Sequence, residues 1–174
     1  MTTAQRREAI LRELQLHTEA ITAGALAREF GVSRQVIVQD VAMLRAGGTA
    51  VLATPSGYLL PRADAGNSAQ RIFCCRHSGL TQMQKELELI VDAGASVQDV
   101  TVSHPVYGEI KAMLMLSTRE AVAHFLQALK TNGAGPLSSI TGGVHLHLVQ
   151  AKDETVLDRV AQALRAEGLL AEEE

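Results

Sequence analysis

The stretch AITAGALAREFGVSRQVIVQDVAMLRAGGTAVLATPSGYLLPR, residues 20–62, decides how the first part of the chain folds. Thr22 can cap a short helix that Gly31 ends, because glycine accepts the left-handed conformation found after a helix C-terminus. Ser33 can cap a second helix over residues 34–46, whose apolar side chains fall on one face. Two helices joined by so short a turn are typical of a helix-turn-helix, although an ordinary helical hairpin with a polar outer face has the same spacing.

The residues on either side of this pair of helices favour the helix-turn-helix. After two glycines, the apolar runs 50–53 and 58–60 predict two short strands around the turn-forming sequence TPSG. A hairpin at this place is the wing of a winged helix. An apolar stripe over residues 4–16 predicts a further helix before the pair. We therefore predict a winged helix-turn-helix domain over residues 1–62.

The beginning of the second helix carries side chains that suit DNA recognition. In a helix-turn-helix, the N-terminal residues of this helix enter the major groove. Arginine pairs with guanine and glutamine with adenine, while serine and the helix N-terminus can hold a phosphate. The expected contacts with double-stranded DNA are Ser33, Arg34, Gln35 and Gln39 in the helix, together with Thr54 and Ser56 in the wing.

The charge distribution agrees with DNA as a partner of the first part alone. Residues 1–62 contain seven arginines and five acidic residues, whereas residues 63–174 contain nine basic and fourteen acidic residues. An excess of positive charge suits a polyanion, so the second part is expected to have another role. Aromatic residues make up 3% of the chain, which argues against a base-stacking surface for single-stranded nucleic acid.

The chain also lacks the sequence features of export and of membrane insertion. Its first residues do not resemble a signal peptide, and no stretch approaches the roughly 20 apolar residues of a membrane-spanning helix. Cys74 and Cys75 are adjacent, an arrangement that seldom forms a disulfide because the intervening peptide would be strained. We expect a cytoplasmic protein with no membrane partner, in which both cysteines are reduced and pack as small hydrophobes.

The second part alternates strands and helices. The small, polar, turn-rich residues 63–70 are expected to be a linker. The expected strands are residues 71–76, 97–102, 110–116 and 144–149. The expected helices follow a capping box at Thr81 and Gln84, a second one at Ser117 and Glu120, and a cap at Asp153. This β-α-β-β-α-β order with a final helix predicts an α+β sandwich over residues 71–174, with helices on one face of a single sheet.

Three histidines and a glutamate in this second part form a candidate metal site. His145 and His147 are two residues apart on an expected strand, so both imidazoles point to the same face. His77 follows the first strand, and Glu86 lies on the next helix, where it can turn toward the sheet. Such a donor set suits zinc, nickel or ferrous iron. The alternative is that these histidines are ordinary core or surface residues, and Cys75 is a rival ligand on the same strand face as His77.

Three segments resemble one known family. Residues 20–62, the segment DVTVSHPVYGEI (99–110) and the segment GGVHLH (142–147) are similar to those of the niacin-responsive repressors, and the resemblance covers nearly the whole chain. Proteins of this family combine an N-terminal winged helix with a C-terminal three-histidine (3H) domain.

The resemblance implies a function and a set of partners. It implies repression of genes for NAD biosynthesis or niacin uptake, with nicotinic acid or nicotinamide as co-repressor and a DNA operator as target. It also implies a homodimer held largely through the C-terminal domain. The divalent metal ligands that it implies are His77, Glu86, His145 and His147, with Glu88 as the alternative carboxylate.

The segment HPVYG leaves two roles open for one histidine. His104, with Tyr107, lies beside the effector pocket in the functional interpretation. In the structural interpretation, the imidazole of His104 braces the turn that contains the proline.

Two other functions compete with a ligand-responsive repressor. The first is a metal-dependent enzyme with a DNA-targeting winged helix, and the second is a DNA-binding module whose other domain only dimerises. An enzyme would need a general base near the metal, for which the candidates are Glu86 and Glu109. The sequence contains no nucleophile elbow, phosphate-binding loop or zinc-protease helix, so we expect the protein not to be an enzyme.

Overall fold

The computed structural model describes residues 1–62, 66 and 68–171, and the chain divides into two compact units, residues 1–63 and 64–174. Of the expected linker over residues 63–70, residues 63–65 and 67 lie outside the described part. Its last two residues were assigned wrongly, because Ala69 and Gln70 belong to the first strand of the second unit and pair with its neighbour.

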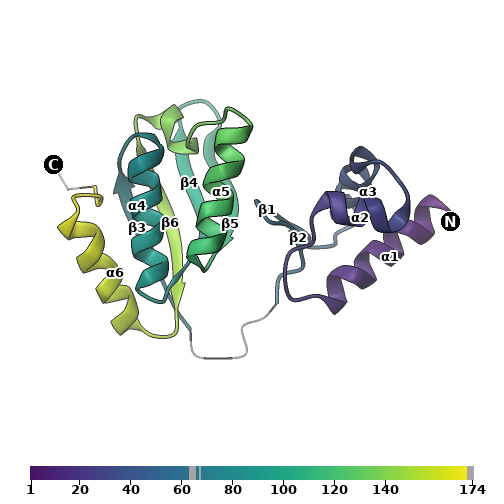
Figure 1. Ribbon diagram of the computed structural model, residues 1–174, viewed down its shortest axis with the longest axis horizontal. Coiled ribbons are helices and arrows are strands. Elements are labelled where there is room, and N and C mark those ends of the chain that lie inside the picture. The colour runs from purple at the N-terminus through teal and green to yellow at the C-terminus, as the bar shows by residue number, and fades with distance from the viewer. Residues whose placement is uncertain (63–65, 67, 172–174) are drawn as a thin grey trace. The chain divides into compact units, whose positions relative to one another are not determined.

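The first unit is a winged helix-turn-helix (Figure 1). Its elements are α1 (Thr3–Leu16), α2 (Ala23–Phe30), α3 (Arg34–Ala46), β1 (Leu52–Thr54) and β2 (Gly57–Leu59). The predicted caps are confirmed: the side chains of Thr22 and Ser33 accept backbone N–H groups of the first turns of α2 and α3. Gly31 ends α2 in the left-handed conformation with a φ of 65°.

Helices α1 and α3 are joined by a buried ion pair as well as by a hydrophobic core. The fully buried side chains Ile10, Leu14, Leu26, Ile37 and Val41 form the centre of that core. Asp40 of α3 is 2% exposed and accepts hydrogen bonds from Arg6 Nε at 2.6 Å and Arg7 Nε at 3.1 Å, both on α1. Since α3 is the second helix of the helix-turn-helix and α1 precedes the motif, this carboxylate holds α3 against α1.

The wing is anchored to the segment before α2. Strands β1 and β2 pair antiparallel, and Tyr58 of β2 also bridges to Ile21. A Cβ atom added to Gly57, whose φ is 126°, would lie 2.4 Å from the carbonyl oxygen of Ile21. Only glycine therefore permits this close approach of the wing to the helices.

The second unit is a four-stranded sheet with its helices on one face (Figure 1), as the α+β prediction requires. Its elements are β3 (Ala69–Arg76), α4 (Gly79–Asp92), β4 (Ser96–His104), β5 (Gly108–Leu116), α5 (Arg119–Thr131), the 3-10 helix η1 (Leu137–Thr141), β6 (Val144–Ala151) and α6 (Glu154–Ala166). The strand order is β3-β6-β4-β5, and all three neighbouring pairs are antiparallel. The sequence interpretation missed η1, whose five residues are too few to show a helical period.

Two of the predicted helix starts are wrong. Helix α4 begins at Gly79 after Ser78, two residues before Thr81, and it has no side-chain cap. Helix α5 is capped by Thr118, whose hydroxyl accepts the N–H of Ala121 at 3.1 Å, and not by the neighbouring Ser117. In both places a capping pattern can be read at more than one position, and the packing of the helix decides which is used. The cap at Asp153 is confirmed.

Strand β4 contains an irregularity next to β6. Val97 pairs with Val149 and Thr101 pairs with Leu146, so three residues of β4 lie opposite two residues of β6. This is the arrangement of a β-bulge. On its other side β4 also changes register against β5, where Met115 has a positive φ of 53°. Asp99 lies within this irregular segment.

Among the described residues, none of the helices is long and apolar enough to cross a membrane.

Candidate metal centre and nucleic-acid interface

The fold brings the four predicted metal-binding side chains together in the interior of the second unit. His145 and His147 lie on the face of β6 that is buried under the helices, since alternate residues of this strand are buried. His77 follows the end of the neighbouring strand β3, and Glu86 lies on α4 above them. The exposed fractions are 6% for His77, 0% for Glu86, 3% for His145 and 2% for His147.

Glu86 is the centre of this cluster. Its two carboxylate oxygens both lie 3.2 Å from His145 Nε2, and Oε1 lies 3.6 Å from His147 Nε2. Nε2 of His77 contacts the other oxygen, Oε2. The alternative carboxylate, Glu88, contacts Gln84 and Arg119 instead, so the structure places Glu86 and not Glu88 among the imidazoles.

The second nitrogen of two of these rings fixes where their hydrogens are. His145 Nδ1 lies 2.9 Å from the carbonyl oxygen of Gly143, and His147 Nδ1 lies 2.6 Å from that of Asp99. A carbonyl oxygen only accepts, so Nδ1 must carry the hydrogen in both rings. A neutral ring then has its lone pair on Nε2, which in both cases points at the Glu86 carboxylate. Two lone-pair groups facing each other repel, so the arrangement requires a cation: either a proton on the imidazole or a metal ion.

The pKa shifts of Glu86 and His147 also indicate that the cluster favours a cation beside the Glu86 carboxylate. Burial raises the pKa of the Glu86 carboxyl, but the charge of His147 and the hydrogen bonds from the three histidines outweigh it and hold that pKa well below its usual range. Burial lowers the pKa of His147, and here too the charge of Glu86 and its hydrogen bond outweigh burial, so the pKa is raised. The cluster therefore contains a buried carboxylate anion that attracts positive charge.

The residues present fit a divalent metal ion. Hydrogen bonds from the far side of a ligating imidazole to backbone carbonyls are the usual way in which such a ligand is oriented, and His145 and His147 both have one. Among the described residues, Nδ1 of His77 is a buried side-chain nitrogen without a hydrogen-bond partner. Three imidazole nitrogens and one carboxylate suit zinc, nickel or iron, as the sequence suggested.

Cys75, the rival ligand that the sequence placed on the same strand face as His77, lies beside this cluster. Its sulfur, a Glu86 oxygen and a His145 nitrogen all lie within 4.8 Å of one another. Burial and the negative charge of Glu86 raise the pKa of the Cys75 thiol, so it is a neutral S–H group that packs in the core. Cys74, its neighbour on the opposite face of β3, is exposed.

Two residues that sequence reasoning did not assign also shape the cluster. A Cβ atom at Gly143, whose φ is 93°, would lie 2.3 Å from the carbonyl oxygen of His77, so this glycine lets β6 approach His77. Asp99 supplies the carbonyl that holds His147. The double glycine before VHLH was a signal for the first, and an aspartate inside the apolar strand 97–102 was a signal for the second.

The structure favours the bracing role of His104. Its Nδ1 accepts the backbone N–H groups of Val106 at 3.1 Å and Tyr107 at 3.2 Å, which closes the turn between β4 and β5. The Tyr107 side chain is 79% exposed. Neither residue lines the hollow that lies beside His145. That hollow has a volume of about 270 Å³ and is lined by Thr101, Ser103, Glu109, Thr141, Val144, His145 and Leu146.

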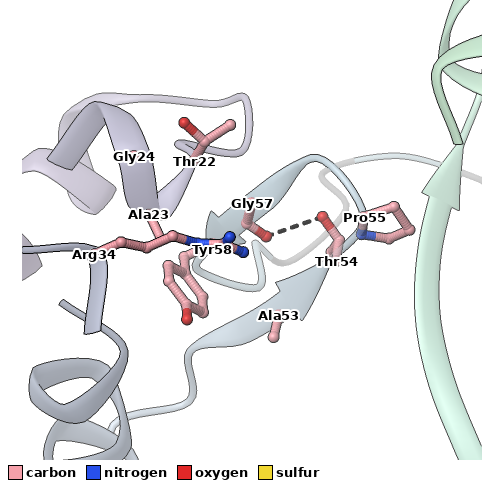
Figure 2. A pocket seen from close by; sticks show the side chains of 9 residues that line it. All are labelled: Thr22, Ala23, Gly24, Arg34, Ala53, Thr54, Pro55, Gly57 and Tyr58. Atoms are coloured by element: carbon pink, nitrogen blue, oxygen red, sulfur yellow. Dashed lines mark hydrogen bonds between the residues drawn. The ribbon is translucent and has the colours of Figure 1, made fainter. Parts of the chain in front are cut away.

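The first unit presents the start of α3 to solvent. Arg34, Gln35 and Gln39 are exposed, as a recognition helix requires. The hydroxyl of Ser33 is occupied by the N–H of Val36, so Ser33 acts as the helix cap. In the wing, the Thr54 hydroxyl donates to the carbonyl of Gly57 at 3.0 Å (Figure 2). It also accepts the N–H of Ser56, so its first role is to close the turn.

Arg34 also faces the wing. Figure 2 shows its side chain extending from the start of α3 toward the wing, beside Tyr58. It lines an open hollow of about 400 Å³ together with the start of α2 and the wing turn. The lining residues are Thr22, Ala23, Gly24, Arg34, Ala53, Thr54, Pro55, Gly57 and Tyr58. A guanidinium beside the N-termini of two helices is suited to a phosphate group.

A winged helix-turn-helix joined to an α+β domain with a buried histidine–glutamate cluster defines a class, the DNA-binding regulators with a separate second domain. Residues 6–59 match the family described as HTH domain, and residues 70–173 match the 3H domain. The transcription repressor NadR of Bacillus subtilis (strain 168) is 42% identical over 169 residues, which cover 96% of this chain and 93% of that protein. The probable transcription repressor NiaR of Thermotoga maritima is 39% identical over 169 residues, which cover 97% of this chain and 95% of that protein. The chain belongs to the NiaR-like family of transcription repressors, as its three resembling segments predicted.

Proposed function

We propose that this protein represses genes of NAD biosynthesis or niacin uptake, with nicotinic acid as co-repressor at or near a divalent metal ion. His77, Glu86, His145 and His147 would hold the ion, which is nickel, zinc or iron. The observation that carries the proposal is the Glu86 carboxylate, which lies among three imidazoles, two of them with Nδ1 held by backbone carbonyls. In this proposal the protein is a regulator and not an enzyme.

The proposed ion leads us to expect a preference among pyridine ligands. When bound, it supplies a positive charge and a position for an oxygen or nitrogen donor. Three neutral imidazoles and one carboxylate leave a divalent ion with positive charge in excess. Nicotinic acid at neutral pH carries a carboxylate that compensates this charge, whereas nicotinamide does not. Recognition through the carboxylate therefore favours the acid.

The hollow beside His145 is suited to a small polar ligand. His145 is one of its lining residues, and so are the hydroxyl-bearing residues Thr101, Ser103 and Thr141. These groups can donate to or accept from a ring substituent, which is how a largely preformed pocket orients a small molecule. We propose this hollow as the effector site in place of the His104 and Tyr107 surface, because His104 is engaged in its own turn.

We propose that DNA binding uses α3 and the wing of two chains. Gln35 and Gln39 would contact base edges in the major groove, and Arg34 would contact a backbone phosphate from the hollow that it lines with the wing. One such unit reads few bases, so an operator with two half-sites and a homodimer is the arrangement that gives genomic specificity. Effector and operator must then strengthen each other's binding by the same factor.

The test of the metal and effector site is a pair of alanine variants. His145→Ala and His147→Ala should lose bound metal in elemental analysis and lose the effect of nicotinic acid on operator binding, while weak operator binding without effector remains. His124→Ala is the matched control, because this histidine is exposed on α5 and should leave both properties unchanged. A full response to effector in His145→Ala protein without metal would contradict the proposal.

The test of the DNA surface uses the start of α3. Arg34→Ala and Gln35→Ala should each lower operator affinity by roughly 1–3 kcal/mol, with effector binding intact. A phosphate contact is lost equally on all sequences and reduces the salt dependence, whereas a base contact is lost at one operator position. We expect the first pattern for Arg34→Ala and the second for Gln35→Ala. Arg12→Ala, an exposed arginine of α1, is the control. Unchanged affinity in both α3 variants would rule out α3 as the recognition helix.

A further inference from the structure

Asp99 connects the histidine cluster with the other side of the sheet. Its backbone carbonyl accepts Nδ1–H of His147 at 2.6 Å, on the helix-covered side. Its own side chain is 4% exposed, and Oδ1 accepts the backbone N–H of Leu148 at 3.2 Å. Its second oxygen, Oδ2, lies 3.5 Å from Nζ of Lys111, whose side chain is 55% exposed.

These contacts occur where the hydrogen-bond ladder between β4 and β6 is broken. The bulge in β4 places Asp99 opposite His147 and Leu148 without regular pairing. Each bulge leaves backbone groups without their usual partners. Here the carboxylate of Asp99 accepts the N–H of Leu148, and the carbonyl of Asp99 accepts Nδ1–H of the His147 ring. Asp99 thus provides hydrogen-bond acceptors for two consecutive residues of β6, His147 and Leu148.

We propose that Asp99 is a positioning residue for the metal centre. Its Oδ1 atom fixes the bulge, and the bulge aims the carbonyl that holds His147 with Nε2 toward Glu86. This inference rests on the proposed function, because a positioning role presupposes the proposed metal site. The hydrogen bond from His147 Nδ1–H to the Asp99 carbonyl does not itself need a metal ion. The position of Oδ1 matters for this role and the negative charge does not, because Leu148 N–H needs an acceptor at one place.

Two substitutions separate position from charge. Asp99→Asn keeps an acceptor oxygen at the same place and removes the charge. Asp99→Glu keeps the charge and moves the oxygen by one methylene. Lys111→Met removes the cation beside Oδ2 and is the control for an effect of charge alone. All three are measured in the full chain, and unfolding of any one variant is recognised from its circular dichroism.

The first measurement needs no metal. In metal-free protein, the Nδ1–H proton of His147 should give a downfield resonance that exchanges slowly with water, assigned by its absence in His147→Gln. We expect this resonance to persist in Asp99→Asn and Lys111→Met and to broaden or vanish in Asp99→Glu. The second measurement is nickel and zinc affinity, which should fall about 10–100-fold in Asp99→Glu and stay near wild type in the other two.

The outcomes distinguish the two proposals. If the wild-type chain binds neither metal, the metal proposal fails, and the proton resonance alone still decides the role of Asp99. An unchanged resonance in Asp99→Glu would overturn the inference. A loss in Asp99→Asn as large as that in Asp99→Glu would also overturn it, because the position of the acceptor oxygen would then not be sufficient. A loss in Lys111→Met as large as that in Asp99→Glu would overturn it as well, because the charge of the Asp99–Lys111 pair would then matter.

Discussion

Gly143 shows how a residue without a side chain can determine a binding site. Its φ of 93° is unfavourable for other residues, and an added Cβ atom would lie 2.3 Å from the backbone oxygen of His77. Backbone atoms cannot turn aside as a flexible side chain can. The carbonyl of Gly143 also accepts Nδ1–H of His145, so a shift here moves two of the three imidazoles.

The adjacent Gly142 provides a control within the same turn. Its φ is 68°, and a Cβ atom there would meet nothing within 4 Å. Gly142→Ala should therefore cost only the left-handed conformation, about 1–2 kcal/mol of unfolding free energy. Gly143→Ala should cost more than Gly142→Ala and should also weaken nickel or zinc binding. Denaturant titration and metal titration of both variants check this, and equal effects of the two would contradict it.

The sequence could predict some of these side-chain positions and not others. His145 and His147 share a face because a strand has a period of two, whatever else happens in the fold. The choice between Glu86 and Glu88 could not be made, since two residues turn a helix by more than half a revolution and α4 begins earlier than its apparent cap. An aspartate inside an apolar strand was a signal for Asp99, but its role could not be predicted, because a bulge leaves no mark in the alternation of a mostly buried strand.

At the level of elements, a single carboxylate adds an ion pair to the hydrophobic contact between α1 and α3. Asp40 is 2% exposed and serves both Arg6 and Arg7, whose side chains are 13% and 31% exposed. Asp40→Ala leaves the nearly buried Arg6 without its partner. We expect a loss of about 3 kcal/mol in the stability of the first unit, because removing one member of a buried ion pair leaves an uncompensated charge.

The comparison for this prediction is an exposed carboxylate on the same helix. Glu8 of α1 is 70% exposed and lies 3.5 Å from Arg12, so Glu8→Ala should change stability by less than about 1 kcal/mol. Denaturant unfolding of the full chain, followed by circular dichroism, measures both. Asp40→Ala should also bind operator more weakly, since α3 loses its connection to α1. A stability equal to that of Glu8→Ala would show that the hydrophobic core alone holds the two helices.

Elements were predictable where local chemistry decides them. The caps at Thr22, Ser33 and Asp153 have little competition, and the structure uses all three. Where Ser117 and Thr118 compete, the packing of α5 selects the second. The strand order β3-β6-β4-β5 follows from contacts between distant parts of the chain, which a local pattern does not contain.

At the level of the whole molecule, the division of charge separates two tasks. The arginine-rich first unit suits a polyanion, and the acidic second unit does not. The second unit is therefore free to associate with a copy of itself, and we expect a twofold-symmetric homodimer formed mainly by residues 71–174. The sequence could predict this division, because the net charge of each segment follows from its amino-acid composition and does not depend on the fold.

Light scattering at micromolar concentration tests the assembly. The full chain should have the mass of a dimer, and a shortened chain beginning at residue 68 should keep it, since the first unit is not required. The first unit alone, residues 1–62, should be a monomer. A monomeric full chain would contradict the homodimer, and a dimer formed only by residues 1–62 would place the interface in the wrong unit.

The burial of the four cluster side chains also affects how fast the proposed metal ion could exchange. Glu86 lies at 0% exposure on α4, and the packing of Met83, Leu87 and Ile90 holds that helix to the sheet. For the ion proposed here, departure would require α4 to open locally, and such openings become rarer as packing improves. Exchange of the ion would then be far slower than the coming and going of a small molecule in the neighbouring hollow. The ion would behave as a permanent part of each protein copy, acquired once and kept through many rounds of repression and release.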